Sequence, residues 1–197
     1  MLDRDEIMDV QLAAFEGEEA AGALAAGGEP DLNALDRLAE ALDVLQQGIA
    51  KGTMDAGWIR PTVDDVRAAQ HLVKLVREGA PREQLREPAE RVFRVTADPR
   101  ALRALCVTLP SLVGEATDIL SSEQILEGLD RAAVFFKRGG KVVDFVPTPE
   151  DMACLQRLRA IATGEGAEAL SERRALVARF WARVPDDYVS KGIRRCA

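Results

Sequence analysis

The only histidine of the chain, His71, is the first residue to test for catalysis, because imidazole is the usual base of Ser-His-Asp and Cys-His sites. Such a site requires the ring to face a nucleophile in a pocket. In the helix predicted for residues 62–79, His71 falls on the same side as Asp64 and Lys74, opposite the valines and leucines. We therefore expect His71 to lie in solvent, and we assign no catalytic residue.

The three cysteines are Cys106, Cys154 and Cys196, and they are far apart in the sequence. Neither a Cys-x-x-Cys pair nor a helical His/Glu spacing is present to assemble a zinc site, so we expect no metal and no cofactor. Cys106 and Cys154 fall on apolar helix faces, where cysteine acts as a small hydrophobic residue. The odd number of cysteines argues against a disulfide framework and predicts a cytoplasmic location.

The sequence contains no glycine-rich phosphate-binding loop, and the nearest feature is the run 137–141, which places three cations around two glycines. The same pattern is typical of a helix end, where glycines follow the last turn and basic residues complete it. A second basic region, residues 171–197, has a net charge of +4 and includes Trp181 and Tyr188. The residues predicted to contact an anion or a nucleic acid are Lys137, Arg138, Lys141, Arg194 and Arg195.

Carboxylates that could take part in catalysis are present, but each has a structural explanation. Asp64 and Asp65 fall in the first turn of a predicted helix, where acidic residues are favourable. Asp144 lies inside the strand-like run 141–146; the structural interpretation is a buried acid that pairs with Arg173 of the last predicted helix, and a catalytic acid is the alternative. An enzyme whose site is assembled from distant carboxylates and arginines is therefore kept only as an alternative.

The acidic charge is concentrated at one end of the chain. The 197 residues carry a net charge of −7, from 33 acidic and 26 basic residues. Residues 1–50 contain twelve acidic and two basic residues, whereas the remaining 147 residues have a net charge of +3. An acidic segment of this kind docks on a basic partner, lies against a basic face of its own chain or a second subunit, or serves solubility.

Two predicted helices carry this acidic charge. Residues 2–25 have a weak apolar stripe and run into an Ala- and Gly-rich linker, so residues 1–30 are expected to form an acidic arm. The next helix runs from about Pro30 to Gln47 and stops at Gly48. Its apolar residues follow spacings of 3 and 4, which indicate either core packing or a seam for a partner. The residues of this leucine seam are Leu35, Leu38, Leu42, Leu45 and Ile49.

Residues 31–197 are predicted to form a single helical domain. Helix-capping patterns and interrupting prolines divide this region into short helices. The expected helices span residues 62–79, 82–95, 98–109, 111–120, 121–138, 148–162 and 167–184. At most one short extended segment is expected, near 141–146. The predicted fold class is therefore all-α, a multi-helix bundle of short helices packed at varied angles.

These features favour a non-enzymatic bacterial protein that binds other proteins, as an adaptor, a chaperone-like protein or an inhibitor. It would use the leucine seam and the acidic arm, and its partner would be another protein or a second copy of itself. The alternative is a nucleic-acid-binding regulator that uses the basic C-terminal region, which a pI near 4.9 opposes. No membrane association is expected, because no apolar run approaches the roughly 18 residues of a membrane span. The acidic start of the chain differs from the basic start of a secretory signal.

Overall fold

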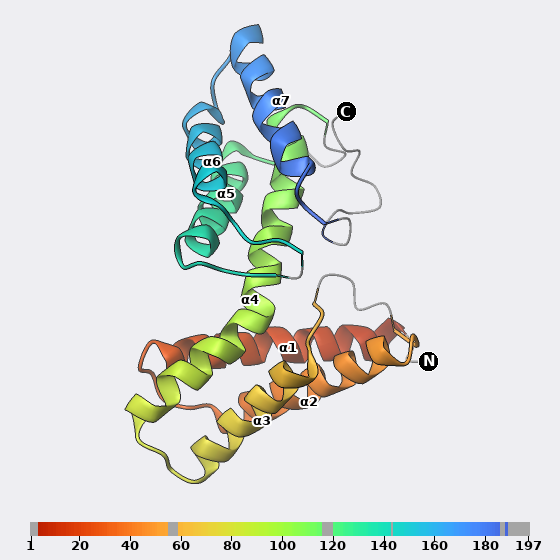
Figure 1. Ribbon diagram of the computed structural model, residues 1–197, viewed down its shortest axis with the longest axis vertical. Coiled ribbons are helices and arrows are strands. Elements are labelled where there is room, and N and C mark those ends of the chain that lie inside the picture. Colours follow the sequence, from red (N-terminus) through yellow and green to blue (C-terminus); the bar gives the residue numbers. More distant parts are fainter. Residues whose placement is uncertain (1–3, 55–58, 116–119, 143, 186–187, 189–197) are drawn as a thin grey trace. The chain divides into compact units, whose positions relative to one another are not determined.

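A computed structural model describes residues 4–54, 59–115, 120–142, 144–185 and 188 of the chain (Figure 1). Within these residues the structure consists of seven α-helices and contains no β-strand. The helices are α1 (Arg4–Ala25), α2 (Leu32–Ala50), α3 (Val63–Arg77), α4 (Arg82–Leu112), α5 (Ser122–Lys137), α6 (Pro149–Ile161) and α7 (Ala167–Trp181). The predicted all-α, multi-helix class is confirmed.

The chain divides into two compact units, Met1–Ala97 and Asp98–Ala197, which we call unit 1 and unit 2. The division falls inside α4, so each unit contains part of this helix as well as three other helices. The predicted boundary between an N-terminal arm and a single domain, near residue 30, does not coincide with this division. Instead, α1 supplies fully buried residues, including Ala14 and Ala21, to the core of unit 1.

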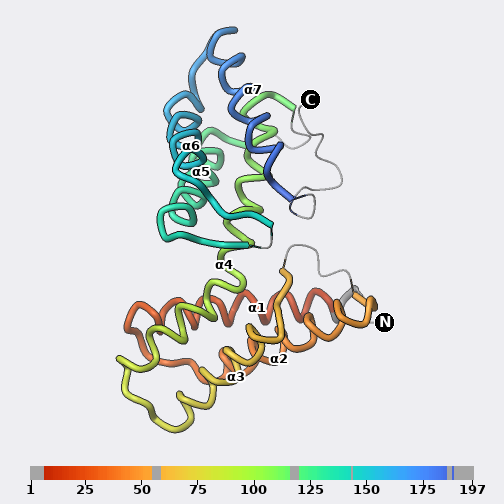
Figure 2. Tube along the Cα trace, viewed as in Figure 1, coloured from red at the N-terminus to blue at the C-terminus, as the bar shows by residue number. Residues whose placement is uncertain are grey.

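Unit 1 is built around the antiparallel pair of α1 and α2, with α3 beside α2 (Figure 2). Leu35, Leu38 and Leu42 of α2 are buried among residues of α1, α3 and the first part of α4. The two helices of the pair approach each other closely at Gly17. A Cβ atom at this position would lie 2.3 Å from Leu38 Cβ and 2.9 Å from the carbonyl oxygen of Ala34. The backbone of α1 therefore packs directly on α2, which requires glycine at this point.

Three helices begin at the residues that the capping patterns predicted. Thr62, Ser121 and Thr148 are the N-caps of α3, α5 and α6, and each accepts a hydrogen bond from the backbone N–H three residues later. The side chains of the N3 residues, two aspartates and a glutamine, accept hydrogen bonds from the N-cap backbone in return. These capping boxes satisfy donors that the first turn of a helix leaves without partners.

The predicted interruptions between residues 82 and 112 are wrong, because α4 continues through Pro88, Pro99 and Pro110. A proline inside a helix removes one backbone hydrogen bond and crowds the preceding turn. Here burial outweighs that cost, since α4 contributes fully buried side chains along its length, among them Ala89 in unit 1 and Leu105 in unit 2. The predicted helix start at Asp98 instead coincides with the boundary between the units.

The predicted stop of the second helix at Gly48 is also wrong, because α2 continues to Ala50. The glycine is buried, and a Cβ atom there would lie only 2.8 Å from Met54 Cβ. Gly48 therefore allows the chain that leaves α2 to pack back against the helix. This close approach depends on contacts beyond the helix, which a local pattern does not contain.

Unit 2 contains a cluster of aromatic side chains that come from α5, α7 and the segment between α5 and α6. Phe136 is central, with ring centroids 5.6 Å from Phe135, 6.0 Å from Phe145 and 6.1 Å from Phe180. The predicted extended segment is reduced to one antiparallel bridge between Val142 and Phe145, whose two N–O distances are 3.1 and 3.2 Å. This bridge closes a tight turn in the segment between α5 and α6, and Phe145 lies in the core.

Candidate functional site

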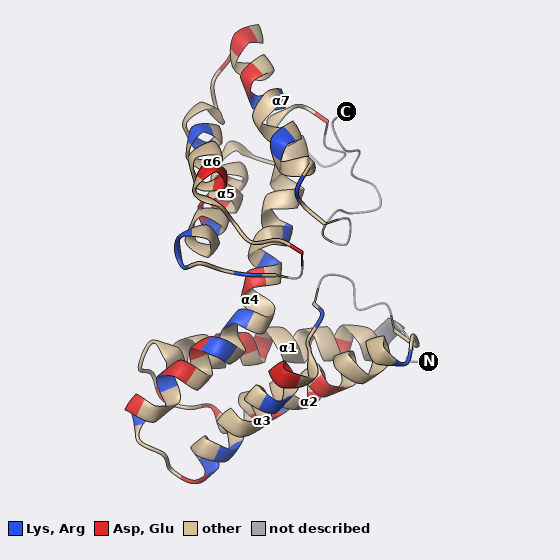
Figure 3. Ribbon diagram, viewed as in Figure 1, with Lys and Arg blue, Asp and Glu red and all other residues tan. Residues whose placement is uncertain are grey.

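A groove runs between α1 and α2 on the surface of unit 1. It consists of two adjoining depressions of about 480 and 280 Å³, and Arg37 lines both of them. We call it the acidic groove, because six of its lining residues carry a carboxylate and only one is a cation. The carboxylates belong to Asp9, Glu16, Glu19, Glu29, Asp31 and Glu40. Figure 3 shows the acidic and basic residues on both helices.

The helical repeat explains how the groove forms. Residues three or four apart share one face of a helix, and Asp9, Ala13, Glu16 and Ala20 follow this spacing along α1. On α2 the lining residues follow the same spacing. The apolar part of the lining consists mainly of small residues, namely Ala13, Ala20, Ala23, Ala34 and Ala41. Short side chains leave room in the groove for the side chains of a bound molecule.

Three of the six carboxylates have structural partners. Glu16 forms an ion pair with Arg37, in which Oε2 lies 2.6 Å from Nη1. Glu29 pairs with Arg82 at the start of α4. Asp31 is the N-cap of α2 and accepts a hydrogen bond of 3.0 Å from the backbone N–H of Ala34. These contacts fix the walls of the groove.

The other three carboxylates, those of Asp9, Glu19 and Glu40, form no ion pair or hydrogen bond within the part of the chain that the structure describes. Asp9, Glu19 and Glu40 are exposed. Since Arg37 is already paired, the groove has an excess of negative charge that faces solvent. This excess attracts cations, and the attraction decreases as salt screens it.

The leucine seam lies inside unit 1. Leu35 is 1% exposed, and Leu38, Leu42 and Leu45 are fully buried. Ile49 is half-buried and packs against the small cluster of Leu45, Met54 and Ile59. The spacing therefore reflects core packing, the first of the two interpretations, and these leucines form no surface for a partner in this structure.

The run 137–141 forms the end of α5 rather than an open anion-binding loop. Arg138 pairs with the buried carboxylate of Asp98, and Lys141 donates its backbone N–H to the second oxygen of that carboxylate, at 2.9 Å. The backbone of Gly140 bonds to the carbonyl oxygen of Phe135, which completes the helix cap. The side chains of Lys137 and Lys141 are exposed. Arg194 and Arg195 lie outside the described residues.

The predicted pairing of Asp144 with Arg173 is wrong. Asp144 is exposed and has a φ of 61°, which places it in the tight turn closed by the Val142–Phe145 bridge. The guanidinium of Arg173 instead donates to the carbonyl oxygens of Leu112, Ile161 and Gly164, at 2.7, 2.9 and 2.6 Å. One cation thus serves the C-terminal ends of both α4 and α6, where unpaired carbonyls accumulate.

The sequence did not predict the structural ion pair between Asp151 and Arg183, which is formed in addition to the pair of Asp98 and Arg138. Asp151, at 1% exposure, belongs to the capping box of α6 and also pairs with Arg183. The guanidinium of Arg183 lies 5.3 Å from the ring centroid of Phe145 and donates to the carbonyl oxygen of Val146 at 3.1 Å. The acidic first turn of α6 was a signal for the cap, but no local pattern identifies an arginine 32 residues later.

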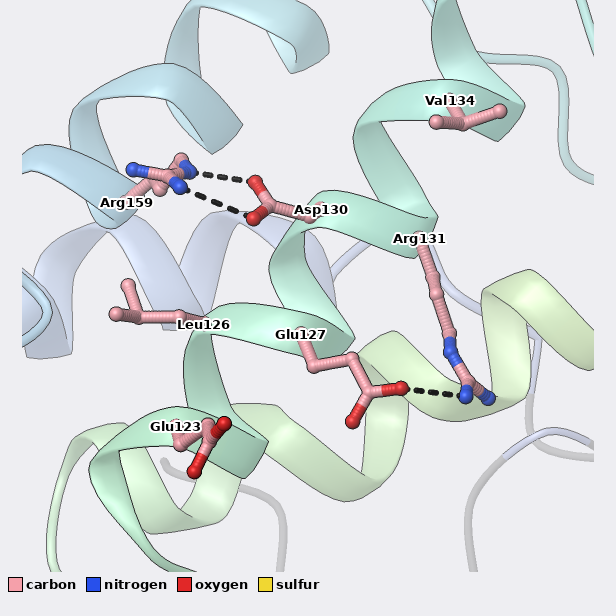
Figure 4. Close-up of a pocket in the computed structure, with 7 residues that line it drawn as sticks. All are labelled: Glu123, Leu126, Glu127, Asp130, Arg131, Val134 and Arg159. Atoms are coloured by element: carbon pink, nitrogen blue, oxygen red, sulfur yellow. Dashed lines mark hydrogen bonds and ion pairs between the residues drawn. The ribbon is translucent and has the colours of Figure 1, made fainter.

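A separate surface depression, of about 710 Å³, lies along the outer side of α5 (Figure 4). Its α5 residues are Glu123, Leu126, Glu127, Asp130, Arg131 and Val134, and Arg159 of α6 completes the lining. Arg159 donates two hydrogen bonds to Asp130, at 2.5 and 3.0 Å, and these bonds hold the pKa of the Asp130 carboxyl below its usual value. Glu127 pairs with Arg131 at 2.6 Å. We call this surface, together with Lys137 at the end of the helix, the α5 face.

The histidine and the two cysteines of the described ranges lie where the sequence predicts. His71 is exposed on α3, as predicted. Cys106 and Cys154 are buried, and burial raises the pKa of the Cys154 thiol, which lowers its reactivity. Among the described residues, no group of three or more His, Cys, Asp and Glu side chains is placed to hold a metal ion. None of the helices in the described ranges is long and apolar enough to cross a bilayer.

Comparisons with known proteins return no relatives: no protein-family model, no curated protein and no solved structure matches the chain.

Proposed function

We propose that this chain is a non-enzymatic interaction protein whose acidic groove binds a basic segment of another protein. The observation that carries the proposal is the excess charge of the groove. Asp9, Glu19 and Glu40 have no partner among the described residues, and the one cation of the groove, Arg37, is paired with Glu16. A ligand with Lys or Arg side chains would satisfy these carboxylates.

The shape of the groove favours a helical segment with basic residues on one face. The groove follows two antiparallel helices, and alanines supply most of its apolar lining. A third helix that lies in such a groove places residues i, i+3, i+4 and i+7 toward it. Basic residues at these positions would reach the carboxylates on both sides, while small or aliphatic residues between them would contact the alanines.

The nucleic-acid alternative has less support. Most arginines of unit 2 in the described ranges already have protein partners, so few are available for phosphates. Those in ion pairs are Arg131, Arg138, Arg157, Arg159 and Arg183. The net charge of −7 also repels a polyanion. An enzyme assembled from distant carboxylates and arginines has no more support, since two of the three buried acids in the described part of the chain, Asp98 and Asp151, each pair with an arginine as part of the fold.

Alanine is abundant in the chain, arginine outnumbers lysine, and cysteines are few. These features favour a bacterial cytoplasmic protein. The partner would then be a cytoplasmic protein with an accessible basic helix.

The proposal is tested with a synthetic peptide of about 18 residues that carries Arg or Lys at i, i+3, i+4 and i+7 and Ala or Leu elsewhere. Binding of the labelled peptide is measured by fluorescence anisotropy, at salt concentrations from about 20 to about 300 mM. We expect affinity to fall as salt rises. The double variant Glu19→Gln with Glu40→Gln should weaken binding roughly three- to tenfold at low salt, because it removes two unpaired charges from the groove.

The matched control is Glu83→Gln with Glu87→Gln, which changes the net charge equally at two exposed residues of α4 outside the groove. This control should change the affinity by less than about twofold. Equal weakening by the two double variants would show that only the overall charge attracts the peptide. That result, or no binding at low salt, would contradict the proposal.

A further inference from the structure

The α5 face exposes apolar side chains at the surface of unit 2. Val134 is 60% exposed, and Leu126 is half-buried at the edge of the same depression. At roughly 100° per residue, Glu123, Asp130, Val134 and Lys137 fall within an arc of about 60° on the outer side of α5. These residues form one continuous stripe along the helix.

Unpaired charges of opposite sign lie at the two ends of this stripe. Glu123 and Lys137 are exposed, and neither forms an ion pair or hydrogen bond within the described ranges. They are fourteen residues apart, about 21 Å along the helix axis. The other charged residues of the face already have partners, since Asp130 pairs with Arg159 and Glu127 with Arg131.

The stripe is complementary to itself when one copy is reversed. Asp130 is the midpoint between Glu123 and Lys137, and it is also the midpoint between Leu126 and Val134. A two-fold axis near Asp130 therefore brings Glu123 of each copy opposite Lys137 of the other, and Leu126 opposite Val134. The two α5 dipoles are then antiparallel, which is favourable. A parallel arrangement would place like charges together at both ends.

We propose that the α5 face is the interface of a homodimer in which two copies of α5 pack antiparallel around Asp130. The molecule that covers the α5 face is a second copy of this chain, because the two-fold axis places charges of opposite sign together and apolar residues together. The Asp130–Arg159 pairs lie near the axis and carry no net charge there. The inference goes beyond the acidic groove and does not depend on it.

One face of a helix of sixteen residues offers a small interface, below the roughly 1,000 Å² of a stable complex. The dimer is therefore weak and forms at high protein concentration. Sedimentation of the full chain from about 10 to about 500 μM should show the average mass rising from 21.4 kDa toward twice that value.

The decisive test exchanges the charges at the ends of the stripe. Glu123→Lys and Lys137→Glu, each alone, should remove dimerisation, because every end of the interface then has two like charges. The double variant should dimerise again. An equal mixture of the two single variants should also dimerise, as a heterodimer, because one variant then has a lysine at both ends of its stripe and the other has a glutamate at both ends.

Regained association in the mixture excludes misfolding of the single variants as the cause of their loss. Val134→Asp provides a second measurement and should weaken self-association at least about tenfold by placing a charge in the apolar part of the interface. Two results would overturn the inference. One is a wild-type chain that is monomeric at every concentration, and the other is single charge variants that dimerise as the wild type does.

Discussion

The Nε of Arg173 donates a hydrogen bond of 2.7 Å to the carbonyl oxygen of Leu112, the last residue of α4. The Nη1 of the same guanidinium bonds to two carbonyl oxygens at the end of α6. Arg173 therefore joins three helices of unit 2, because it is a residue of α7 that completes the ends of α4 and α6.

Replacing Arg173 with Met should lower the free energy of unfolding by about 2 kcal/mol, since it leaves three carbonyl oxygens without their charged donor. Urea denaturation followed by circular dichroism measures the change. The control is Arg174→Met, because Arg174 is exposed and has no partner in the described part of the chain. A similar loss in both variants would contradict the capping role.

Replacing Gly17 with Ala distinguishes packing from helix propensity, because the two predict changes of opposite sign in the free energy of unfolding. Propensity alone predicts that alanine stabilises a helix by up to about 1 kcal/mol relative to glycine. Because the added Cβ would lie 2.3 Å from Leu38 Cβ, we instead expect a loss of about 1–3 kcal/mol. Thermal or urea unfolding decides between the two, and an increase in stability would show that α1 and α2 do not approach closely.

Asp151 combines a helix cap with a buried ion pair, so Asp151→Asn should cost more than the loss of the cap alone. We expect about 2 kcal/mol for Asp151→Asn, because Arg183 keeps its charge and loses its partner. Thr148→Ala, which removes only the N-cap side chain of the same helix, should cost about 1 kcal/mol. Equal unfolding midpoints for the two variants would indicate that the ion pair contributes nothing.

The Asp130–Arg159 pair predicts a small dependence of stability on pH. The hydrogen bonds from Arg159 lower the pKa of Asp130 in the folded state, so the stabilisation is present above the pKa of the unfolded chain. It is lost as the pH falls through the lowered pKa of the folded state. Since both side chains are half exposed, the contribution is only a few tenths of a kcal/mol.

Unfolding midpoints of the wild type and of Asp130→Asn, measured between about pH 7 and about pH 2, test this dependence. The difference between the two proteins should be largest near neutral pH and should disappear in acid. A difference that is constant with pH would show that the substitution acts through packing rather than through the charge of the carboxylate.

The sequence predicted those parts of the fold that depend on neighbouring residues. Thr62 and Thr148 were identified as helix starts because the residues that complete their caps lie three positions away. The continuity of α4 through Pro99 was missed, because burial against distant helices decides whether a proline interrupts a helix. The contacts of Arg173 were missed for the same reason, since their acceptors lie at the ends of two other helices.

The candidate groove was predictable in part. The concentration of acidic residues in 1–50 indicates a surface for a basic partner, but the weak apolar stripe of residues 2–25 favours an arm rather than a wall of a groove. That weakness arises from Ala14, Gly17 and Ala21, small residues that score low for hydrophobicity and still allow close packing. The same small residues bring α1 and α2 together and so create the groove.

The three prolines of α4 have a consequence for how this helix acquires its structure. A peptide of residues 82–112 lacks three backbone donors and most of its burial, so on its own in water it should be largely random coil by circular dichroism. The helix is then a product of the cores that form around it and not a nucleus for them. Amide exchange along α4 should accordingly report the opening of whichever core surrounds each amide.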